Sequence, residues 1–448
     1  MSVALVILAA GKGTRMQSEL PKVLHHLAGM PMLGHVINTG NSISPARMII
    51  VTGHGAQAVE TFAKDFNKNV ETVFQPEQLG TGHAIDQARE TLADFHGNVI
   101  ILYGDVPLLK SSTLANLNAS LSKADLSVLG FETETPDRYG RLVVDNDNLK
   151  RIIEFKDASK SEKGIKLCNS GLMAISKTLL FELLTKINNQ NASGEFYLPD
   201  IVEHAVAAGK SCKVMLCNEL ETMGVNSRAE LSKAELEYQN RRRNAALENG
   251  VTMLAPSTVH FSYDTNIGCD TIIEQNVVFG PGVTVETGSQ IKAFSHLEGA
   301  FVAKGSIVGP YARLRPGTQL EKNVKIGNFV EVKESRIATG AKVNHLSYIG
   351  NASIGARANI GAGTITCNFD GVMKHQTKIG TDAFIGSNTM LVAPVSVGKE
   401  ALTASGSVIV NDVPNGALAL GRSKQVNKPG LAIKLLARFR SLKATKKE

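Results

Sequence analysis

The sequence predicts two folds in one chain: a Rossmann-like α/β domain with a mostly parallel sheet, followed by a parallel β-helix of hexapeptide repeats. In residues 1–226 short apolar runs alternate with helical stretches, which is the pattern of an α/β domain. In residues 250–448 aliphatic residues recur every six positions, a repeat typical of a β-helix. A charged stretch at 227–249 separates the two patterns. At 448 residues the chain is too long for one ordinary core, which agrees with this division.

The elements of the first part follow from its apolar runs. The runs that predict buried strands are 4–9, 48–51, 99–103 and 126–129. Helical patterns lie between them at 83–92 and 112–124. Because parallel strands present their carboxyl ends at one edge of the sheet, we expect ligands at that edge.

The charged stretch predicts a linker helix. Ser227 is a candidate N-cap, and Glu230 follows it at the spacing of a capping box. Gly250 is placed to end the helix. The expected division is an α/β domain at 1–226, a linker helix at 227–249, and a β-helix domain with a basic C-terminal tail at 250–448.

Three runs of residues carry the six-residue period. They are Ile267, Ile273, Phe279, Val285, Ile291 and Leu297; Val302, Val308, Leu314, Leu320, Ile326 and Val332; and Ile379, Ile385, Leu391, Val397, Thr403 and Ile409. One coil cannot bury its own apolar side, so coils stack and the runs become a continuous interior column. Breaks in the period predict loops that leave the coil, the largest at 367–378.

Composition excludes several classes of protein. A hydrophobic share of 43% and a charged share of 20% are those of a soluble globular chain. The apolar run at 3–10 is too short to span a bilayer, and its cations follow it, unlike those of a signal peptide. We therefore expect no membrane partner. The five cysteines are scattered and form no Cys-x-x-Cys pair, which favours the reducing cytoplasm.

The positive charge of the chain is concentrated at its C-terminus. Nine Lys or Arg residues follow position 420, against the single acid Glu448. Such a tail is usually solvated or binds a partner, and a role in binding an anionic cofactor is the alternative. Nucleic acid is not expected, because the chain has no Trp and an aromatic share of only 5% for stacking on bases.

The first chemical motif follows the first predicted strand. The residues LAAGKGTRM at 8–16 present Gly-x-Gly backbone N–H groups, Lys12 and Arg15 to a phosphate. A dinucleotide fingerprint would need a third glycine where Met16 stands. A P-loop is excluded too, because no Gly-Lys-Ser/Thr closes the turn. Lys22 adds a further cation.

Two further features point to a nucleotide site. Gln75 precedes a second glycine turn at 79–82, which opens the predicted helix. The buried strand at 99–103 ends close to Asp105, whose carboxylate can hold Mg²⁺ against a nucleotide phosphate.

These motifs occur together and in order with others. The further motifs are PK at 21–22, QLGTGHA at 78–84, YGD at 103–105, YGR at 139–141, EFKD at 154–157, NSG at 169–171 and GVN at 224–226. The chain resembles the bacterial bifunctional N-acetylglucosamine-1-phosphate uridyltransferase / glucosamine-1-phosphate acetyltransferase family, essentially from end to end. The second-half motifs are the more specific, since the first half alone would fit several sugar nucleotidyltransferases.

The resemblance implies roles in the first domain. Arg15 and Lys22 would be catalytic and face the triphosphate of UTP, and Asp105 and Asn226 would bind Mg²⁺. The residues implied to bind UTP or UDP-N-acetylglucosamine are Leu8, Ala9, Ala10, Gly11, Lys22, Gln75, Gly80, Thr81, Tyr103, Gly104, Asp105, Gly140, Glu154, Asn169 and Asn226. The implied reaction is in-line attack of a sugar 1-phosphate on the α-phosphorus of UTP, with release of pyrophosphate.

A second constellation lies in the repeats. Arg315 and Lys333 are 18 residues apart, so if three hexapeptides make one turn they project from adjacent coils and form a phosphate pocket. His345 follows, and an imidazole can accept a proton near neutral pH. Acetyl transfer to an amine needs such a base, because the ammonium must lose a proton before its nitrogen attacks the thioester.

The resemblance implies that His345 is this base and that the β-helix is left-handed and trimeric. Glucosamine 1-phosphate would be held by Arg315, Lys333, Tyr348 and Asn359, and acetyl-CoA by Ala362, Asn368, Phe369, Ser387, Ser405 and Arg422. Three positions depart from the family pattern. Tyr is usual at Phe369, Ala at Ser405 and Gly at Asn344, and the missing phenol removes one possible hydrogen bond to a ligand.

The sequence therefore predicts a cytoplasmic homotrimer that makes UDP-N-acetylglucosamine from UTP, glucosamine 1-phosphate and acetyl-CoA. One alternative is a single-activity nucleotidyltransferase acting on glucose 1-phosphate, with a regulatory β-helix. Another is a non-enzymatic trimeric scaffold. Asp105, Lys22 and Asn226 disfavour the scaffold, and His345 with the two cations disfavours a regulatory helix.

Overall fold

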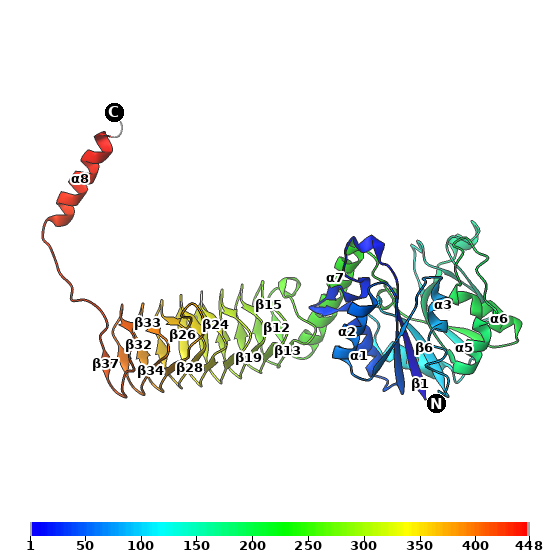
Figure 1. The fold of residues 1–448 in the computed structure, drawn as a ribbon, viewed down its shortest axis with the longest axis horizontal. Coiled ribbons are helices and arrows are strands. Elements are labelled where there is room, and N and C mark those ends of the chain that lie inside the picture. The colour runs from blue at the N-terminus through cyan, green and yellow to red at the C-terminus, as the bar shows by residue number, and fades with distance from the viewer. Residues whose placement is uncertain (1, 446–448) are drawn as a thin grey trace. The chain divides into compact units, whose positions relative to one another are not determined.

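The computed structural model describes residues 2–445, so Lys446, Lys447 and Glu448 of the basic tail lie outside the described residues. The chain forms two compact units. Residues 2–245 with 261–263 make up the first, and residues 246–260 with 264–445 the second. Figure 1 shows the α/β elements of the first unit and the stacked coils of the second. Within the described part of the chain, no helix combines the length and the apolar character needed to cross a membrane.

The first unit is built on a mixed, mostly parallel sheet. Its strands lie in the order β11-β7-β10-β6-β1-β4-β5, and the hairpin of β8 and β9 branches from β10. The strand bounds are β1 Val3–Ala9, β4 Arg47–Thr52, β5 Val70–Phe74, β6 Asn98–Tyr103, β7 Leu126–Glu132, β8 Arg141–Asp145, β9 Asn148–Ile153, β10 Leu167–Ser176 and β11 Cys212–Leu216. Only β10 runs antiparallel to its neighbours β6 and β7 in the main path.

Helices cover both faces of this sheet, which is why its central strands are continuous apolar runs. Along β1 every side chain is buried, and alternate residues enter opposite cores. One core takes in α1 Met32–Asn41, α2 Ala56–Phe66 and α4 Ser111–Ser120; the other takes in α3 Thr81–Asp86, α5 Lys177–Leu184 and α6 Ile201–Ala207. The four predicted strands correspond to β1, β4, β6 and β7. The helix predicted at 83–92 is shorter, since α3 ends at Asp86 and turns follow.

The charged stretch forms α7, Arg228–Glu248. Ser227 Oγ accepts the N–H of Glu230 at 3.2 Å, as an N-cap should. The reciprocal bond of a capping box is shifted by one residue, because Glu230 Oε2 accepts the N–H of Asn226 at 2.6 Å. Gly250, with a φ of +83°, follows the helix. The domain limits drawn from the sequence stay predictions.

The second unit is a coil of parallel rungs arranged in three ladders. One ladder has ten short strands, from β12 Thr252–Met253 to β37 Leu418–Ala419, and the other two have eight each. The register pairs Leu314 with Val332 and Ile267 with Val285, so three hexapeptides make one turn, as the sequence predicts. Some coils are one residue shorter, as where Val285 pairs with Val302 and Val332 with Ile349, and a later coil returns to eighteen, with Ile379 opposite Val397. The six-residue runs are buried in the interior, including Thr403, except that Ile267 in the first coil is half-buried.

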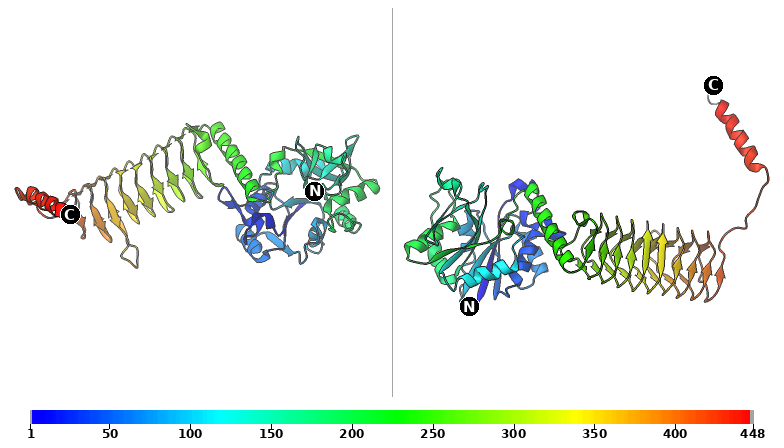
Figure 2. Two further views of the ribbon diagram at one scale, coloured as in Figure 1. Left: turned by 90° about the horizontal axis from the view of Figure 1, so that it is seen from above. Right: turned by 180° about the vertical axis from the view of Figure 1, so that it is seen from behind.

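The largest break in the period is a loop that leaves the coil. It occupies residues 368–376, between β30 Ile365–Cys367 and β31 Thr377–Ile379. Figure 2 (left) shows it projecting from the stacked rungs as a hairpin. Beyond β37 the chain continues without regular structure to α8, Leu431–Thr445.

Two candidate active sites

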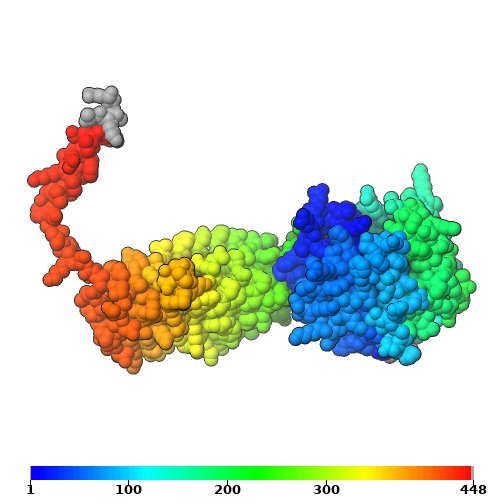
Figure 3. Space-filling view, viewed as in Figure 1, coloured from blue at the N-terminus to red at the C-terminus, as the bar shows by residue number. Residues whose placement is uncertain are grey.

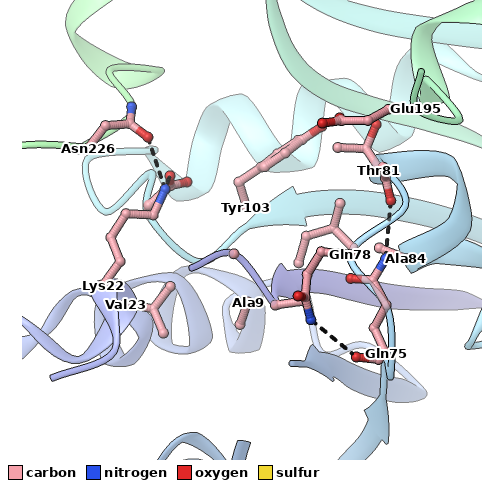
Figure 4. A pocket seen from close by; sticks show the side chains of 15 residues that line it. Ala9, Lys22, Val23, Gln75, Gln78, Thr81, Ala84, Tyr103, Glu195 and Asn226 are labelled. Atoms are coloured by element: carbon pink, nitrogen blue, oxygen red, sulfur yellow. Dashed lines mark hydrogen bonds and ion pairs between the residues drawn. The ribbon is translucent and has the colours of Figure 1, made fainter. Parts of the chain in front are cut away.

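A cavity of about 350 Å³ lies at the carboxyl ends of β1 and β6 (Figure 4). Leu8 and Tyr103 are register partners on these strands, so the residues that follow each strand meet at one edge of the sheet. Most of the predicted nucleotide-binding residues line the cavity: Leu8, Ala9, Ala10, Gly11, Lys22, Gln75, Gly80, Thr81, Tyr103, Asp105 and Asn226. Gly104 lies beneath it and donates its N–H to Leu8 O at 2.9 Å.

One side of this cavity is formed by Gln75, the second glycine turn and Gly11. Gln75 is buried, and its Nε2 donates to Gly80 O at 3.2 Å, which ties the second glycine turn to β5. Thr81 Oγ1 accepts the N–H of Leu198 at 3.0 Å. A Cβ added at Gly11 would meet nothing within 4 Å, so this glycine faces open space. The arrangement leaves backbone polar groups and room for a base.

The opposite side of the cavity gathers charge. The ammonium of Lys22 contacts the carboxylate of Asp105 and donates to Asn226 Oδ1 at 3.0 Å. The N–H of Val225 donates to Asp105 O at 2.9 Å, which holds the two segments together. With Glu230 bonded to its backbone N–H, Asn226 is fixed from behind.

Asp105 and Asn226 form a donor set that fits Mg²⁺. Their oxygens converge on one positive charge, the ammonium of Lys22, so both can face a single cation. Magnesium commonly takes one or two protein oxygens and completes its shell with water and substrate phosphates. Within residues 2–445 no cluster of three or more His, Cys, Asp or Glu residues has the arrangement of a metal site. A metal here would therefore depend on the nucleotide for most of its ligands.

A second cavity, of about 380 Å³, adjoins the first and shares Thr81, Tyr103 and Asn226 with it. It is lined by the predicted sugar-binding residues Gly140, Glu154 and Asn169. A bulge in β10 between Asn169 and Met173 aims the Asn169 side chain at this cavity. Gly171 lies in that bulge with a φ of +86°, and an added Cβ would stand 2.8 Å from the Tyr103 ring.

Arg141 fixes the loop at the rim of the second cavity. Its side chain is buried and donates to the carbonyl of Tyr139, to Asp137 O at 3.1 Å and to Lys163 O at 3.2 Å. The loop thereby held carries Arg138 and Tyr139. Arg15 does not line the nucleotide cavity; it lines a neighbouring cavity of about 460 Å³ with these residues and Asn226.

The sugar-side cavity has an acidic environment of low solvation. Burial raises the pKa of Glu154, and the nearby carboxylates of Asp200 and Asp157 raise it further. Burial also raises the pKa of Tyr103, with Glu154 and Asp105 adding to the effect, so the phenol stays a neutral donor. For Asp200, burial first and then Glu203 and Asp157 raise the pKa to about 6.

We expect Asp200→Asn to stabilise the first unit at neutral pH. The folded carboxyl, with a pKa of about 6, binds its proton more tightly than the unfolded one, at about 3.9. Its contribution to stability is thus present below about pH 4 and is lost as the pH rises to about 6. Discounted for partial solvent screening, the gain at about pH 7 is of order 1–2 kcal/mol. Urea unfolding of the wild type and the variant at about pH 4 and about pH 7 measures the gain in unfolding free energy. An equal gain at the two pH values would rule out the carboxylate as the cause.

In the second unit, His345 is the last residue of β26 Lys342–His345. Its side chain points away from the coil interior and is exposed. Its Nδ1 lies 2.8 Å from Oδ1 of Asn328, its register partner on the preceding coil. An amide oxygen only accepts, so Nδ1 carries the hydrogen and Nε2 is left with a free lone pair. The geometry is that of an oriented base.

Three cations lie close together at the carboxyl ends of β21 Arg313–Leu314 and β24 Glu331–Lys333, which pair on adjacent coils. Arg315 and Lys333 extend adjacent coils at the same position, as predicted, and Arg315 also pairs with Glu331 at 2.7 Å. The third cation is Lys374, from the loop at 368–376. The neighbouring ammonium of Lys374 is the main cause that lowers the pKa of Lys333. A bound phosphate would relieve this repulsion.

Tyr348 and Asn359 lie on the following rungs, and the electrostatic influence of Tyr348 reaches Arg315. Tyr348 begins β27 Tyr348–Gly350 opposite Glu331, and Asn359 begins β29 Asn359–Ile360 opposite Lys342. The Tyr348 hydroxyl passes over Gly350, where a Cβ would collide with it. Gly350 is therefore required by a close approach of side chains.

The loop at 368–376 is braced internally. Asp370 accepts the N–H groups of Val372 at 2.8 Å and Met373 at 2.7 Å, and it pairs with His375 Nε2 at 2.6 Å. The His375 contact, with these N–H groups, lowers the pKa of Asp370. Asn368 is buried, and its Nδ2 donates to Asn351 Oδ1 at 2.7 Å, while Phe369 is exposed.

The remaining residues predicted to bind acetyl-CoA form a line along the coils. The N–H of Asn388 donates to Ala362 O at 2.7 Å, and that of Gly406 to Ser387 O at 2.8 Å, so the positions follow one another from rung to rung. Arg422 extends the line, because its Nη1 donates to Ser405 O at 2.9 Å. The line begins beside His345, whose carbonyl accepts the N–H of Gly363 at 3.2 Å.

Comparison with known proteins matches a domain family in each of the two units. Residues 5–195 match the MobA-like NTP transferase domain, and residues 376–410 match the hexapeptide repeat of succinyl-transferase. The bifunctional protein GlmU of Roseobacter denitrificans is 58% identical over 444 residues, covering 99% of each chain. The same protein from Ruegeria pomeroyi is 57% identical over 448 residues and the full length of both chains, and that from Jannaschia sp. is 56% identical over 99% of this chain and 98% of its own.

The chain belongs to the family of bifunctional GlmU proteins. It is a transferase with two activities: N-acetylation of glucosamine 1-phosphate with acetyl-CoA, and uridylyl transfer from UTP to N-acetylglucosamine 1-phosphate. The repeats form the left-handed β-helix that the sequence predicts. The single-activity and scaffold alternatives are therefore set aside.

Four residues at the two candidate sites were not predicted from the sequence of this GlmU family member. Gln78 and Glu195 line the nucleotide cavity, Asn328 orients His345, and Lys374 joins the cation group. A signal was available for two of them. Lys374 falls in the largest break of the hexapeptide period, and Asn328 lies one coil before His345, at a spacing of 17 where 18 was expected.

Proposed function

We propose that the cavity at the ends of β1 and β6 is the uridylyltransfer site and that the surface around His345 is the acetyltransfer site. The convergence of Lys22, Asp105 and Asn226 on one point of the first cavity carries the first assignment. The oriented imidazole of His345, together with the cation group of Arg315, Lys333 and Lys374 in the same β-helix, carries the second.

In the first site the two substrates are anions that repel each other, so catalysis consists of positioning and charge neutralisation. Gln75 and the turn at 80–81 would hold the uracil, and Glu154 and Asn169 the sugar in the adjoining cavity. Lys22 would stabilise the charge that builds up on the transferred phosphoryl group. Arg15, which lines the neighbouring cavity, would approach the outgoing pyrophosphate.

We infer that Mg²⁺ is the cofactor of the first site, held by Asp105 and Asn226. When bound, it would supply positive charge to the phosphates of UTP. The chain's own part is to fix these two oxygens, through the bond from Val225 to Asp105 O and the bond from Asn226 to Glu230. Lys22 would turn from these oxygens toward the phosphates.

In the second site Arg315, Lys333 and Lys374 would bind the phosphate of glucosamine 1-phosphate, with Tyr348 and Asn359 contacting the sugar. Nε2 of His345 would take a proton from the substrate ammonium, and the freed amine would attack the thioester carbon of acetyl-CoA. The C–S bond would then break, coenzyme A would leave as the free thiol with the proton from His345, and the new amide nitrogen would lose its second proton to solvent. The line of Ala362, Ser387, Ser405 and Arg422 would carry the coenzyme. The product of this second site, N-acetylglucosamine 1-phosphate, would be the substrate of the first site. The final product, UDP-N-acetylglucosamine, would serve cell-wall synthesis in the cytoplasm.

We also propose that the β-helix forms a homotrimer. Four large apolar side chains, Phe294, Tyr311, Phe329 and Leu346, are exposed one above another at the corner next to His345. The rings of Phe294 and Tyr311 stack with centroids 4.9 Å apart, and those of Tyr311 and Phe329 at 5.2 Å. An apolar ridge of this kind is typical of a surface that another copy covers.

We expect Phe329→Lys to weaken trimer formation at least about tenfold, because the ammonium would have to be buried at the contact. Sedimentation analysis over a range of protein concentrations measures the shift toward monomer. Circular dichroism checks that the variant keeps its β-structure. A variant that stays trimeric at every concentration would mean that the ridge lies outside the contact.

The proposed function is tested by assaying both reactions on one purified sample. Free thiol released from acetyl-CoA reports acetylation, and pyrophosphate released from UTP reports uridylyl transfer. Thiol release that requires glucosamine 1-phosphate supports the second assignment. Wild-type protein that releases no thiol would end it.

A further inference from the structure

The C-terminal helix α8 has an apolar face with nothing of its own chain to cover it. Leu431, Leu435, Phe439 and Leu442 recur at the spacing of one helix face, and Leu436 widens it. All described side chains of residues 431–444 are exposed, with Phe439 at 59% and Leu442 at 54% (Figure 3, red). Large apolar groups gathered in this way mark a binding surface.

The charges of α8 are of one sign and border that face. Around the helix, Lys434 and Arg438 lie beyond one edge of the apolar stripe. At the other edge Lys443 lies beside Leu436, and Arg440 lies beyond it. Residues 421–445 contain seven Lys or Arg and no Asp or Glu. The segment therefore holds no carboxylate that could pair with these cations.

The segment before α8 is long enough to separate the helix from the last coil. Residues 422–429 form no helix or strand and contain one large apolar residue, Val426. Eight residues of extended chain span roughly 26–29 Å. The helix can thus meet a surface that the β-helix itself does not touch.

We propose that α8 binds the surface of a membrane that contains anionic phospholipids, lying in the plane of the surface. Leu435 and Phe439 would enter the boundary of the acyl chains, while cations on both edges reach the phosphates. The charge pattern favours this occupant over a second copy, because residues 421–445 contain no acid with which to pair the same residues of a neighbour. The proposal departs from the expectation of no membrane partner, which rested on the lack of a spanning segment.

Vesicle sedimentation with the full chain tests the proposal. Vesicles of phosphatidylcholine with phosphatidylglycerol should bind the protein, and vesicles of phosphatidylcholine alone should bind it far less, with binding falling as salt increases. Phe439→Glu should weaken binding at least about tenfold, because it places a charge in the apolar face. The matched control is Ile433→Glu, which adds the same charge to the same helix away from that face.

Uridylyl transfer, which belongs to the other unit, serves as the folding control for every variant. Equal loss of binding in Phe439→Glu and Ile433→Glu would reduce the effect to net charge and overturn the proposal. So would binding that ignores phosphatidylglycerol, or no binding to either vesicle. A chain that ends at Gly430 should keep the oligomeric mass of the full chain; a loss of mass would make a second copy the occupant of the face.

Discussion

His345→Ala should abolish acetyl transfer while leaving uridylyl transfer intact. Removing a general base typically costs about 10²–10⁴-fold in rate, and the loss should appear in kcat because His345 acts on the proton after the substrate binds. The phosphate-binding cations are unchanged, so the KM for glucosamine 1-phosphate should move little. Initial rates of thiol release from acetyl-CoA measure both quantities.

Variants of Asn328 distinguish a catalytic role of His345 from a purely structural one. In Asn328→Ala the imidazole remains but loses the acceptor that fixes its Nδ1 hydrogen. We expect kcat to fall about tenfold or more with KM nearly constant. Asn328→Asp should instead shift the pH profile of kcat upward, because a carboxylate stabilises the imidazolium. If neither variant changed kcat, His345 would not be acting through an oriented ring.

Asp105→Ala should show the reverse selectivity. It removes one of the two oxygens proposed to hold Mg²⁺ and leaves Lys22 without its carboxylate partner. We expect uridylyl transfer to fall by at least about 10²-fold, and acetyl transfer to remain. Pyrophosphate release at several Mg²⁺ concentrations measures the effect, since weaker binding of the metal should raise the concentration needed.

The exposed carboxylate of Asp145 on β8 offers a matched control for this variant. Asp145→Ala removes the same charge from the same unit, and both activities should persist. If Asp105→Ala and His345→Ala each lost both activities while remaining folded, the two sites would not be independent, and the assignment of one reaction to each unit would fail.

The fold was largely predictable because both patterns in the sequence are periodic. Strands buried on two faces must be continuously apolar, and β1 shows this with no exposed residue. A coil that pairs Leu314 with Val332 must repeat its interior residues at fixed spacing. By contrast, α3 ends earlier than its apolar pattern suggests, since propensity alone does not set where a helix ends.

The relative positions of the candidate site residues were predictable where these residues lie on regular elements. Arg315 and Lys333 met as expected, because the coil keeps its angular register. The loop that carries Lys374 was predictable from the break in the period, but the contact of Lys374 with Lys333 was not, since a residue in an irregular loop can be placed only once the loop's own hydrogen bonds are known. The bond between Glu230 and the backbone of Asn226 was missed for a related reason: a capping box sends that carboxylate to Ser227.

The loop at 368–376 interrupts the coil without altering it. Before and after the loop the rungs keep their pairing, with Ala352 opposite Thr377 and Ile354 opposite Ile379, and the aliphatic column runs on unbroken. Each rung rests only on the two beside it, so extra chain can leave at one corner and return at no expense to the rest. In such an architecture one loop can be replaced, and the residues that it brings to the site changed, while the stacked coils that support it keep their structure.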